Sequence, residues 1–281
     1  MHSALHDKVK EVLATENVVG VLGLGEVDGL PGPCLFTLSD DLSPLVSGPK
    51  WPLAKTAWRL ARSLPADACL GLVCRGCDIR ALEELVKAGQ LRPGAVRTIA
   101  LACSAEQAET CQCESPFPPG ESPMPGVDLT ASASLSRLCL EPGRMELWRE
   151  HFSRCIKCYG CRNACPICVC PECKLENDEY VTLGRVPPDP LAYHLIRAMH
   201  LVDRCVGCGA CQEACPSGLP LLSLHLAMRK ALKERTGFVS GSPALSPLLT
   251  AGREEGHPGG LKPGWEDTLE CSKSEGGEHA G

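Results

Sequence analysis

The spacing of apolar residues along the first part of the chain predicts alternating helices and strands. Apolar positions three and four residues apart indicate a short amphipathic helix over residues 3–14. Two apolar runs, residues 18–24 and 34–38, indicate strands. Pro52 fits the first turn of a further helix, because a proline there loses no helical hydrogen bond. A helix, two strands and a second helix are therefore expected in that order.

The most informative pattern in this region is a β–α–β unit. Strands are predicted at residues 70–74 and 96–102, with a helix between them that Asp78 caps and Gly89 ends. Because such crossovers are almost always right-handed, the two strands should pair in parallel. Residues 1–113 are thus predicted to form a small α/β domain with parallel strands.

The rest of the chain is organised differently. Residues 114–143 are rich in Pro, Gly and Ser, which predicts a linker. Residues 144–236 hold most of the cysteines and are predicted to form a ferredoxin-like dicluster domain with flanking helices. These predicted helices span residues 144–152, 191–201 and 219–232. Residues 237–281 are rich in Gly, Pro, Ser and Glu, which predicts a disordered tail.

Composition adds one outlier, since 20 of the 281 residues are cysteine. A small secreted disulfide scaffold is the usual explanation, but this chain is long, shows no export signal and groups its cysteines tightly. Neighbours this close favour a shared metal over long-range cross-links. Because only 4% of the residues are aromatic, metal–thiolate bonds are expected to replace part of the core in the C-terminal half.

Charge and hydropathy exclude several classes of function. The net charge is −6 and no basic block stands out, so nucleic-acid binding is not expected. The first residues lack the apolar core of a signal peptide, and the apolar run at residues 68–74 is far too short to cross a bilayer. A cytoplasmic protein without an integral membrane segment is therefore expected, and docking onto a membrane complex stays open.

Two cysteine runs share the pattern C-x2-C-x2-C-x3-C-P. They occupy residues 155–166 and 205–216, and bacterial two-cluster ferredoxins use this spacing. Three thiolates two residues apart can hold three corners of one cubane on a tight loop. Small residues such as Gly160 and Ala210 let the backbone approach the sulfides. The duplicated run therefore predicts two [4Fe–4S] clusters.

The fourth cysteine of each run is expected to serve the other cluster, as in two-cluster ferredoxins. Zinc sites usually take two separated C-x-x-C pairs, so four cysteines in one run followed by proline argue against zinc. The predicted ligands of the first centre are Cys155, Cys158, Cys161 and Cys215. The predicted ligands of the second centre are Cys205, Cys208, Cys211 and Cys165.

Three further cysteines follow the first run directly, at Cys168, Cys170 and Cys173. Thiolates so close together could hold a metal, but no fourth ligand is evident. The alternative is a loop whose thiols pack or donate hydrogen bonds near the first cluster. The sequence leaves both interpretations open.

A third metal site is indicated at one edge of the predicted sheet. Cys74 and Cys77 follow one predicted strand and Cys103 follows the next, and parallel strands bring these ends together. Cys111 and Cys113 return after a short helix. The candidate ligands are Cys77, Cys103, Cys111 and Cys113, with Cys74 as the competitor. The alternative is a set of reduced, partly buried thiols.

Nucleotide and flavin sites have weaker signals. Residues 20–25 read G-x-x-G-x-G after a predicted strand, but no convincing helix follows, so the dinucleotide fingerprint is incomplete. No flavin or nicotinamide site is therefore predicted. No general acid–base or nucleophile constellation is evident either, so no catalytic residue is proposed.

With these residues in view, the chain resembles the beta-subunit group of deazaflavin-coenzyme-reducing hydrogenases and formate dehydrogenases. The resemblance covers roughly residues 15–230, and its strongest segments are residues 71–82, 99–103, the Cys111 and Cys113 pair, and residues 148–173. It implies an iron–sulfur subunit beside a catalytic partner of the formate dehydrogenase, hydrogenase or heterodisulfide-reductase type. The chain is short and lacks an obvious flavin-binding stretch, so direct coenzyme reduction by this chain alone is not expected.

Three functions remain to be weighed. The first is an electron-transfer subunit of an anaerobic oxidoreductase complex that relays single electrons through two clusters. The second is a flavin-assisted oxidoreductase that reduces a diffusible coenzyme. The third is a free ferredoxin-like carrier, against which the large α/β domain argues. The first is favoured, with a catalytic oxidoreductase subunit and other redox proteins as partners.

Overall fold

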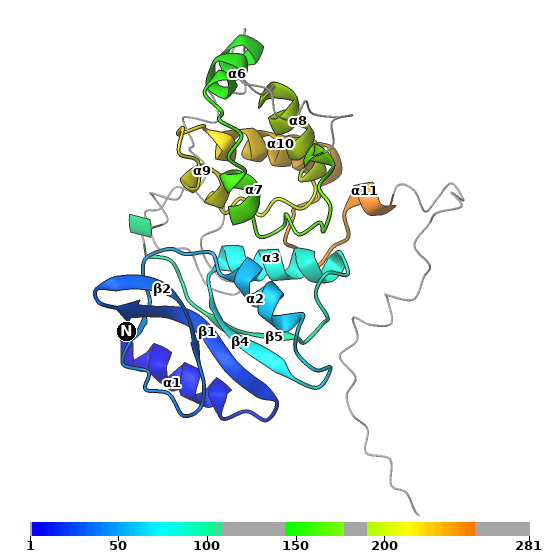
Figure 1. Cartoon of the computed structure of the whole chain (residues 1–281). Coiled ribbons are helices and arrows are strands. Elements are labelled where there is room, and N and C mark those ends of the chain that lie inside the picture. Colours follow the sequence, from blue (N-terminus) through cyan, green and yellow to red (C-terminus); the bar gives the residue numbers. More distant parts are fainter. Residues whose placement is uncertain (1, 105, 108–143, 177–189, 251–281) are drawn as a thin grey trace, which may run out of the picture.

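The computed structural model describes residues 2–104, 106–107, 144–176 and 190–250 (Figure 1). The N-terminal part alternates helices and strands, as the apolar pattern predicts. Its elements are α1 (His2–Leu13), β1 (Val18–Val27), β2 (Leu30–Phe36), β3 (Leu45–Val46), α2 (Ala54–Ala61), β4 (Cys69–Cys74), α3 (Gly76–Lys87) and β5 (Val96–Ala100). Cys111 and Cys113 lie outside the described residues, as do the predicted linker and most of the predicted tail.

The strands form one mixed sheet in the order β2-β1-β4-β5, with β3 paired to the free part of β1. The strands β1, β4 and β5 are parallel, so the predicted β–α–β pairing is confirmed. The expectation of parallel strands does not hold for β2 and β3, which pair antiparallel to β1. For β2 the reason is a two-residue turn at Asp28 and Gly29, both with positive φ, which folds the chain back on β1 as a hairpin.

Helices cover both faces of this sheet (Figure 1). On one face α1 buries Leu5, Val9 and Leu13, so its predicted apolar stripe is confirmed. On the other face lie α2 and α3, which face the C-terminal half of the molecule. Their apolar residues share one core with Val206 and Ala210 from the second cysteine run. The α/β domain and the cysteine-rich part are therefore packed against each other.

A buried carboxylate joins α3 to the start of α2. The helix begins at Gly76, and Asp78 caps it from inside the first turn. One carboxylate oxygen of Asp78 accepts backbone N–H bonds from Leu53 at 2.8 Å and Ala54 at 3.0 Å. The other accepts one from Arg75 at 3.2 Å. Burial raises the pKa of Asp78, against the lowering effect of these three bonds.

The C-terminal half contains short helices around the cysteine runs. These are α6 (Arg144–Ser153), α7 (Gly160–Ala164), the 3-10 turn η1 (Lys174–Glu176), α8 (Pro190–His200), α9 (Ala210–Glu213), α10 (Leu221–Thr236) and α11 (Pro247–Thr250). The three helices expected here correspond to α6, α8 and α10, with boundaries that differ by up to four residues at the end of α10. No helix in the described part of the chain is long and apolar enough to span a membrane.

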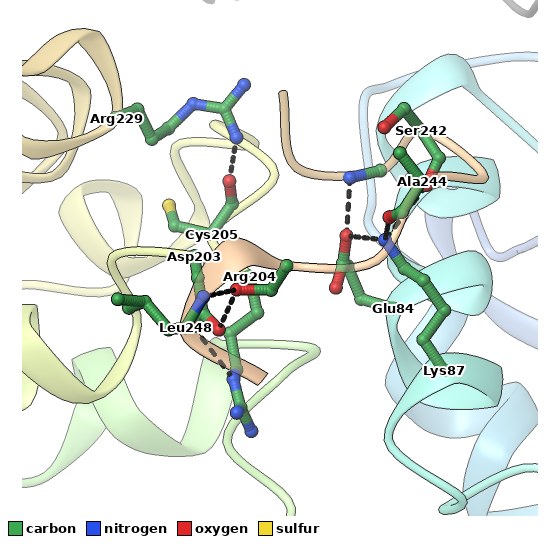
Figure 2. A network of polar contacts seen from close by, with 11 residues as sticks. Glu84, Lys87, Asp203, Arg204, Cys205, Arg229, Ser242, Ala244 and Leu248 are labelled. Carbon is green, nitrogen blue, oxygen red and sulfur yellow. Dashed lines mark hydrogen bonds and ion pairs between the residues drawn. The ribbon is translucent and has the colours of Figure 1, made fainter. Parts of the chain in front are cut away.

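Residues 237–250, which composition assigned to a disordered tail, form a strap that runs along α3 (Figure 2). The ammonium group of Lys87 donates to the backbone carbonyls of Ser242 at 2.8 Å and Ala244 at 3.1 Å. Lys87 also forms a buried ion pair with Glu84 at 2.6 Å. The backbone N–H of Gly241 donates to the same carboxylate.

The strap also contacts the cysteine-rich part. Ser246 donates a hydrogen bond to the carboxylate of Asp203 at 2.7 Å, and Phe238 is buried. Composition is a poor guide here, because the Gly-, Pro-, Ser- and Glu-rich character belongs to residues 237–281 as a whole. The strap alone contains six apolar residues, Phe238, Val239, Ala244, Leu245, Leu248 and Leu249. Its order depends on polar partners that lie far away in the sequence.

The Asp78 contacts predict a large stability effect. Asp78→Ala leaves three buried N–H groups unpaired, each costing about 1–3 kcal/mol. We therefore expect a much lower unfolding midpoint in thermal denaturation followed by circular dichroism. Asp40 is a matched control, because its carboxylate also accepts bonds, from Thr37, but at an exposed position. Asp40→Ala should change the midpoint little, and equal losses in both variants would contradict this account of Asp78.

Candidate metal centres

The two cysteine runs have the same backbone conformation. In each run the residue before the second cysteine and the residue after it have positive φ, which are Lys157 and Tyr159 in the first run and Gly207 and Gly209 in the second. Left-handed backbone at these positions curls each run into a tight loop. A short helix follows in both cases, α7 and α9. The sequence duplication is therefore also a structural one.

The two loops approach each other so closely that one position requires glycine. A Cβ atom at Gly160 would lie 2.7 Å from the backbone oxygen of Ala214, the residue before the last cysteine of the second run. Backbone at this distance cannot give way, so a larger residue would push the runs apart. The contact brings residues that are more than fifty positions apart in the sequence to one place.

The four cysteines predicted for the first centre line one cavity. It lies between the first loop, α8 and the beginning of α10. Cys161 is buried, Cys155 and Cys215 are half-buried, and Cys158 is exposed. The backbone N–H of Lys157 lies 3.3 Å from the sulfur of Cys155 and donates to it. Cys215 thus reaches the ligands of the first run, which is the arrangement that crossed ligation requires.

The cysteines predicted for the second centre are also neighbours. Burial raises the pKa of the Cys208 thiol, and the nearby Cys165 and Cys211 raise it further. Burial likewise raises the pKa of Cys211 to about 12, and Cys205 and Cys165 are among the groups that act on it. Cys165 of the first run also packs in the same core as Cys205 and Cys208 of the second. These thiols bind a metal only after they lose their protons. Because burial disfavours the negative thiolate, the positive charge of the metal has to stabilise it.

The residues present fit a cluster better than a single ion. Within the described residues, no three side chains of His, Cys, Asp or Glu are gathered closely enough to hold one metal ion. A cubane is wider than one ion, because each thiolate binds a different iron at its own corner. Four thiols around one cavity, with backbone N–H groups beside them, suit that geometry.

The two sets differ in their exposure. Beside the first set, Ile156 is 66% exposed, so this edge reaches the molecular surface. The second set lies beneath the α/β domain, where Lys50 donates to the backbone oxygen of Cys208 at 2.6 Å. Lys50 also pairs with Glu213 at 2.9 Å. The α/β domain therefore covers one set and leaves the other accessible.

A second lysine holds the loop that follows the first run. The ammonium group of Lys55 donates to the backbone oxygens of Asn163 and Cys168, each at 2.9 Å. Burial lowers the pKa of Lys55, and the neighbouring Cys165 and Cys168 oppose this effect. Irregular loops leave carbonyl groups without helical partners, and Lys55 satisfies two of them.

The extra cysteines after the first run do not form a separate single-ion site in the structure. Cys168, Cys170 and Cys173 line a cavity of about 410 Å³ between α2 and α8. Cys168 and Cys165 share a side-chain hydrogen bond, which lowers the pKa of Cys165 and raises that of Cys168. This contact favours the interpretation in which these thiols support a neighbouring centre.

The N-terminal cysteines lie where the β–α–β unit predicts. Cys74 ends β4, Cys77 is in the first turn of α3, and Cys103 follows β5. All three are buried. Burial raises the pKa of the Cys74 thiol, as it does for Cys208 and Cys211. Because Cys111 and Cys113 lie outside the described residues, a third centre stays a prediction.

Sequence reasoning missed the polar residues of α8. Tyr193, His194 and Arg197 are almost fully buried and point toward the cysteine sets. Burial, with Arg197 nearby, lowers the pKa of His194 to about 4, so this imidazole is neutral at neutral pH. A histidine and an arginine three residues apart on one helix could have signalled a shared polar face.

Comparisons with known proteins define the class to which this site belongs. Residues 197–217 match the family model described as a 4Fe-4S binding domain. The chain is thus an iron–sulfur protein that combines a 4Fe-4S binding domain with an α/β domain.

Two curated relatives narrow the class. The F420-dependent formate dehydrogenase subunit beta of Methanocaldococcus jannaschii is 40% identical over 110 residues, 39% of this chain. The F420-dependent formate dehydrogenase 1 subunit beta of Methanococcus maripaludis is 36% identical over 108 residues, 38% of this chain. The matches span 29% and 28% of these relatives, under a third of their length. The resemblance to an iron–sulfur beta subunit of this type is confirmed.

The crossed ligand assignment predicts which pairs of cysteine substitutions act on one centre. Cys165→Ala and Cys208→Ala should each remove the second centre, so the double variant should keep about four irons per chain, as each single variant does. The double variant Cys165→Ala with Cys158→Ala should retain almost no iron, because it loses a ligand of each centre. Iron analysis together with low-temperature electron paramagnetic resonance of the reduced protein measures both outcomes.

Uncrossed ligation makes the opposite prediction for the double variants. The Cys165 and Cys158 pair would then keep about four irons, and the Cys165 and Cys208 pair would lose almost all of them. Cys34→Ala is the control, because Cys34 is half-buried in β2 and belongs to neither run. This variant should retain the iron content of the unaltered protein.

Proposed function

We propose that this chain is the iron–sulfur electron-transfer subunit of a formate dehydrogenase-type complex and relays single electrons through two [4Fe–4S] clusters. The single observation that carries the proposal is the contact of two duplicated cysteine runs, with Cys215 lining the cavity of the first set and Cys165 packed in one core with Cys205 and Cys208. Bound clusters would supply one-electron redox chemistry, with the protein setting the potential. The named relatives support the type of complex.

The chain's own residues have three tasks in this proposal. The paired loops position the eight cysteines, and the glycine at position 160 permits the close approach of the two runs. Lys50 links the α/β domain to the second run at Cys208, and Lys55 links it to the loop after the first run at Cys168. The exposed edge at Ile156 and Cys158 leaves the first set open to a partner. Electrons would therefore enter or leave at this edge.

A catalytic subunit is the proposed partner, because no acid–base or nucleophilic constellation was identified in the sequence. Cytoplasmic placement, with or without docking to a membrane complex, belongs to the same proposal. Complexes of the hydrogenase or heterodisulfide-reductase type would use such a relay in the same way. The formate dehydrogenase type is preferred because both relatives named above carry that name.

The test is purification of the native complex without oxygen. About eight irons per chain are expected for two clusters, and about twelve if the N-terminal cysteines hold a third. Formate should reduce the clusters when the catalytic subunit is present. A chain that purifies alone with its full iron content would instead favour the free carrier. About four irons per chain would contradict two clusters.

A second candidate function is a flavin-assisted oxidoreductase acting on a diffusible coenzyme. The observation that favours it is the cavity of about 410 Å³ beside the Cys165 loop, whose lining includes Arg59, Arg62 and His200. Such a cavity could admit an anionic small molecule next to the second centre. Flavin released from the purified protein by acid, and detected by its fluorescence, would favour this candidate over the relay.

The exposed edge predicts where electron exchange can be blocked selectively. Ile156→Glu places a carboxylate on this edge and should slow electron transfer from the catalytic subunit several-fold, with iron content unchanged. Leu30 is the matched control, because it is 74% exposed on the distant β2 strand. Stopped-flow reduction by formate in the complex measures the rate. Equal rates in Ile156→Glu and Leu30→Glu would rule out this edge as the site of exchange.

A further inference from the structure

One helix presents a row of buried polar side chains to the cysteine sets. On α8, Tyr193, His194 and Arg197 are 1%, 2% and 3% exposed. Buried polar groups persist in proteins when they have partners, because an unpaired one costs about 1–3 kcal/mol. The partners of these three side chains include sulfur atoms and backbone of the cysteine loops. The row therefore has a specific relation to the metal centres.

His194 makes the shortest of these contacts to a predicted ligand. Its Nε2 atom lies 3.3 Å from the sulfur of Cys155. Its ring stacks on Phe152 of α6, with 4.6 Å between centroids and 22° between planes, which holds the ring in place. An iron-bound thiolate offers only lone pairs, so Nε2 has to carry the proton and donate it.

Tyr193 makes a longer contact to another ligand of the same set. Its hydroxyl lies 4.0 Å from the sulfur of Cys161, at the outer limit for a hydrogen bond to sulfur. A phenol hydroxyl can donate its hydrogen to a thiolate, which offers only lone pairs. Two donors from one turn of α8 thus face two sulfurs of the first set.

Arg197 acts on both sets rather than one. It donates to the backbone oxygen of Cys161 at 3.1 Å and lies 3.8 Å from the sulfur of Cys168. Its charge also acts on Cys165 and Cys211, which belong to the second set. The arginine is paired with His225 at 2.9 Å, which fixes its position. A change at Arg197 should therefore disturb both centres, unlike a change at His194.

We propose that α8 raises the reduction potential of the first centre through hydrogen bonds from His194 to the Cys155 sulfur and from Tyr193 to the Cys161 sulfur. The inference rests on the proposed function, since it requires a cluster at this set. Reduction adds negative charge to a cluster, and donors to its sulfurs stabilise that charge. His194 and Tyr193 are positioning residues that act through the ligands, and they take no part in ligation.

The experiment compares potentials of the two centres in the full chain. In His194→Phe the aromatic ring and its stacking on Phe152 are kept while the donor is removed. We expect the reduction equilibrium constant of the first centre to fall about tenfold, which is about 59 mV for a one-electron couple. The second centre should not shift. Redox titration followed by low-temperature electron paramagnetic resonance separates the two signals.

Three further variants guard against a merely structural effect. Met199→Phe places the same ring at an exposed position of α8 and should leave both potentials unchanged. His194→Gln retains an N–H donor and should restore part of the shift. Tyr193→Phe should move the first centre in the same direction by less, because its contact is longer.

The outcomes distinguish this inference from the proposed function. If the unaltered chain assembles no clusters, the proposed function fails and the potentials cannot be measured. If both clusters assemble and His194→Phe leaves the first potential where it was, the inference alone is overturned. Equal shifts of both centres would also overturn it, because they would indicate a general loosening of the fold.

Discussion

The close approach of the two cysteine loops is the constraint on which the rest of the structure depends. Cys215 of the second run lines the cavity of the first set, and Cys165 of the first run packs beside Cys205 and Cys208. Such sharing is feasible only if the loops touch, which the glycine at position 160 allows against the backbone of Ala214. Under the proposed crossed ligation, neither run would complete its own set, so the two sites would form together. The fold of the C-terminal half is organised around this contact between the two cysteine loops.

The α/β domain has a clear physical role toward these loops. Loops of this kind leave backbone carbonyls that no helix or strand satisfies. Lys50 and Lys55 reach across from the α/β domain and donate to several of them. Apolar residues of α2 and α3 share a core with the second run at the same time. The α/β domain thus covers the second set of cysteines, which would face solvent if the loops lay on the protein surface.

The two sets consequently sit in different surroundings. The second is covered by the α/β domain, and the first reaches the surface at Ile156. A relay benefits from this difference, because one centre can meet a partner while the other is kept from solvent. The buried polar side chains of α8 lie next to the accessible set, with Arg197 close to both. The two cysteine sets therefore differ in two ways. They differ in how far the α/β domain covers them, and in the hydrogen bonds that they receive from α8.

The sequence by itself determined the local elements and the chemistry of the ligands. Helical spacing, the β–α–β unit and the repeated cysteine run are each encoded within a few neighbouring residues, so α1, the parallel pairing of β4 with β5, and the 4Fe-4S class could be predicted. Only the tertiary structure decided which polar groups serve the site. The order of the strap at Lys87 and the contact of His194 with Cys155 depend on partners far away in the chain. No local pattern specifies such partners, because packing alone brings them within bonding distance.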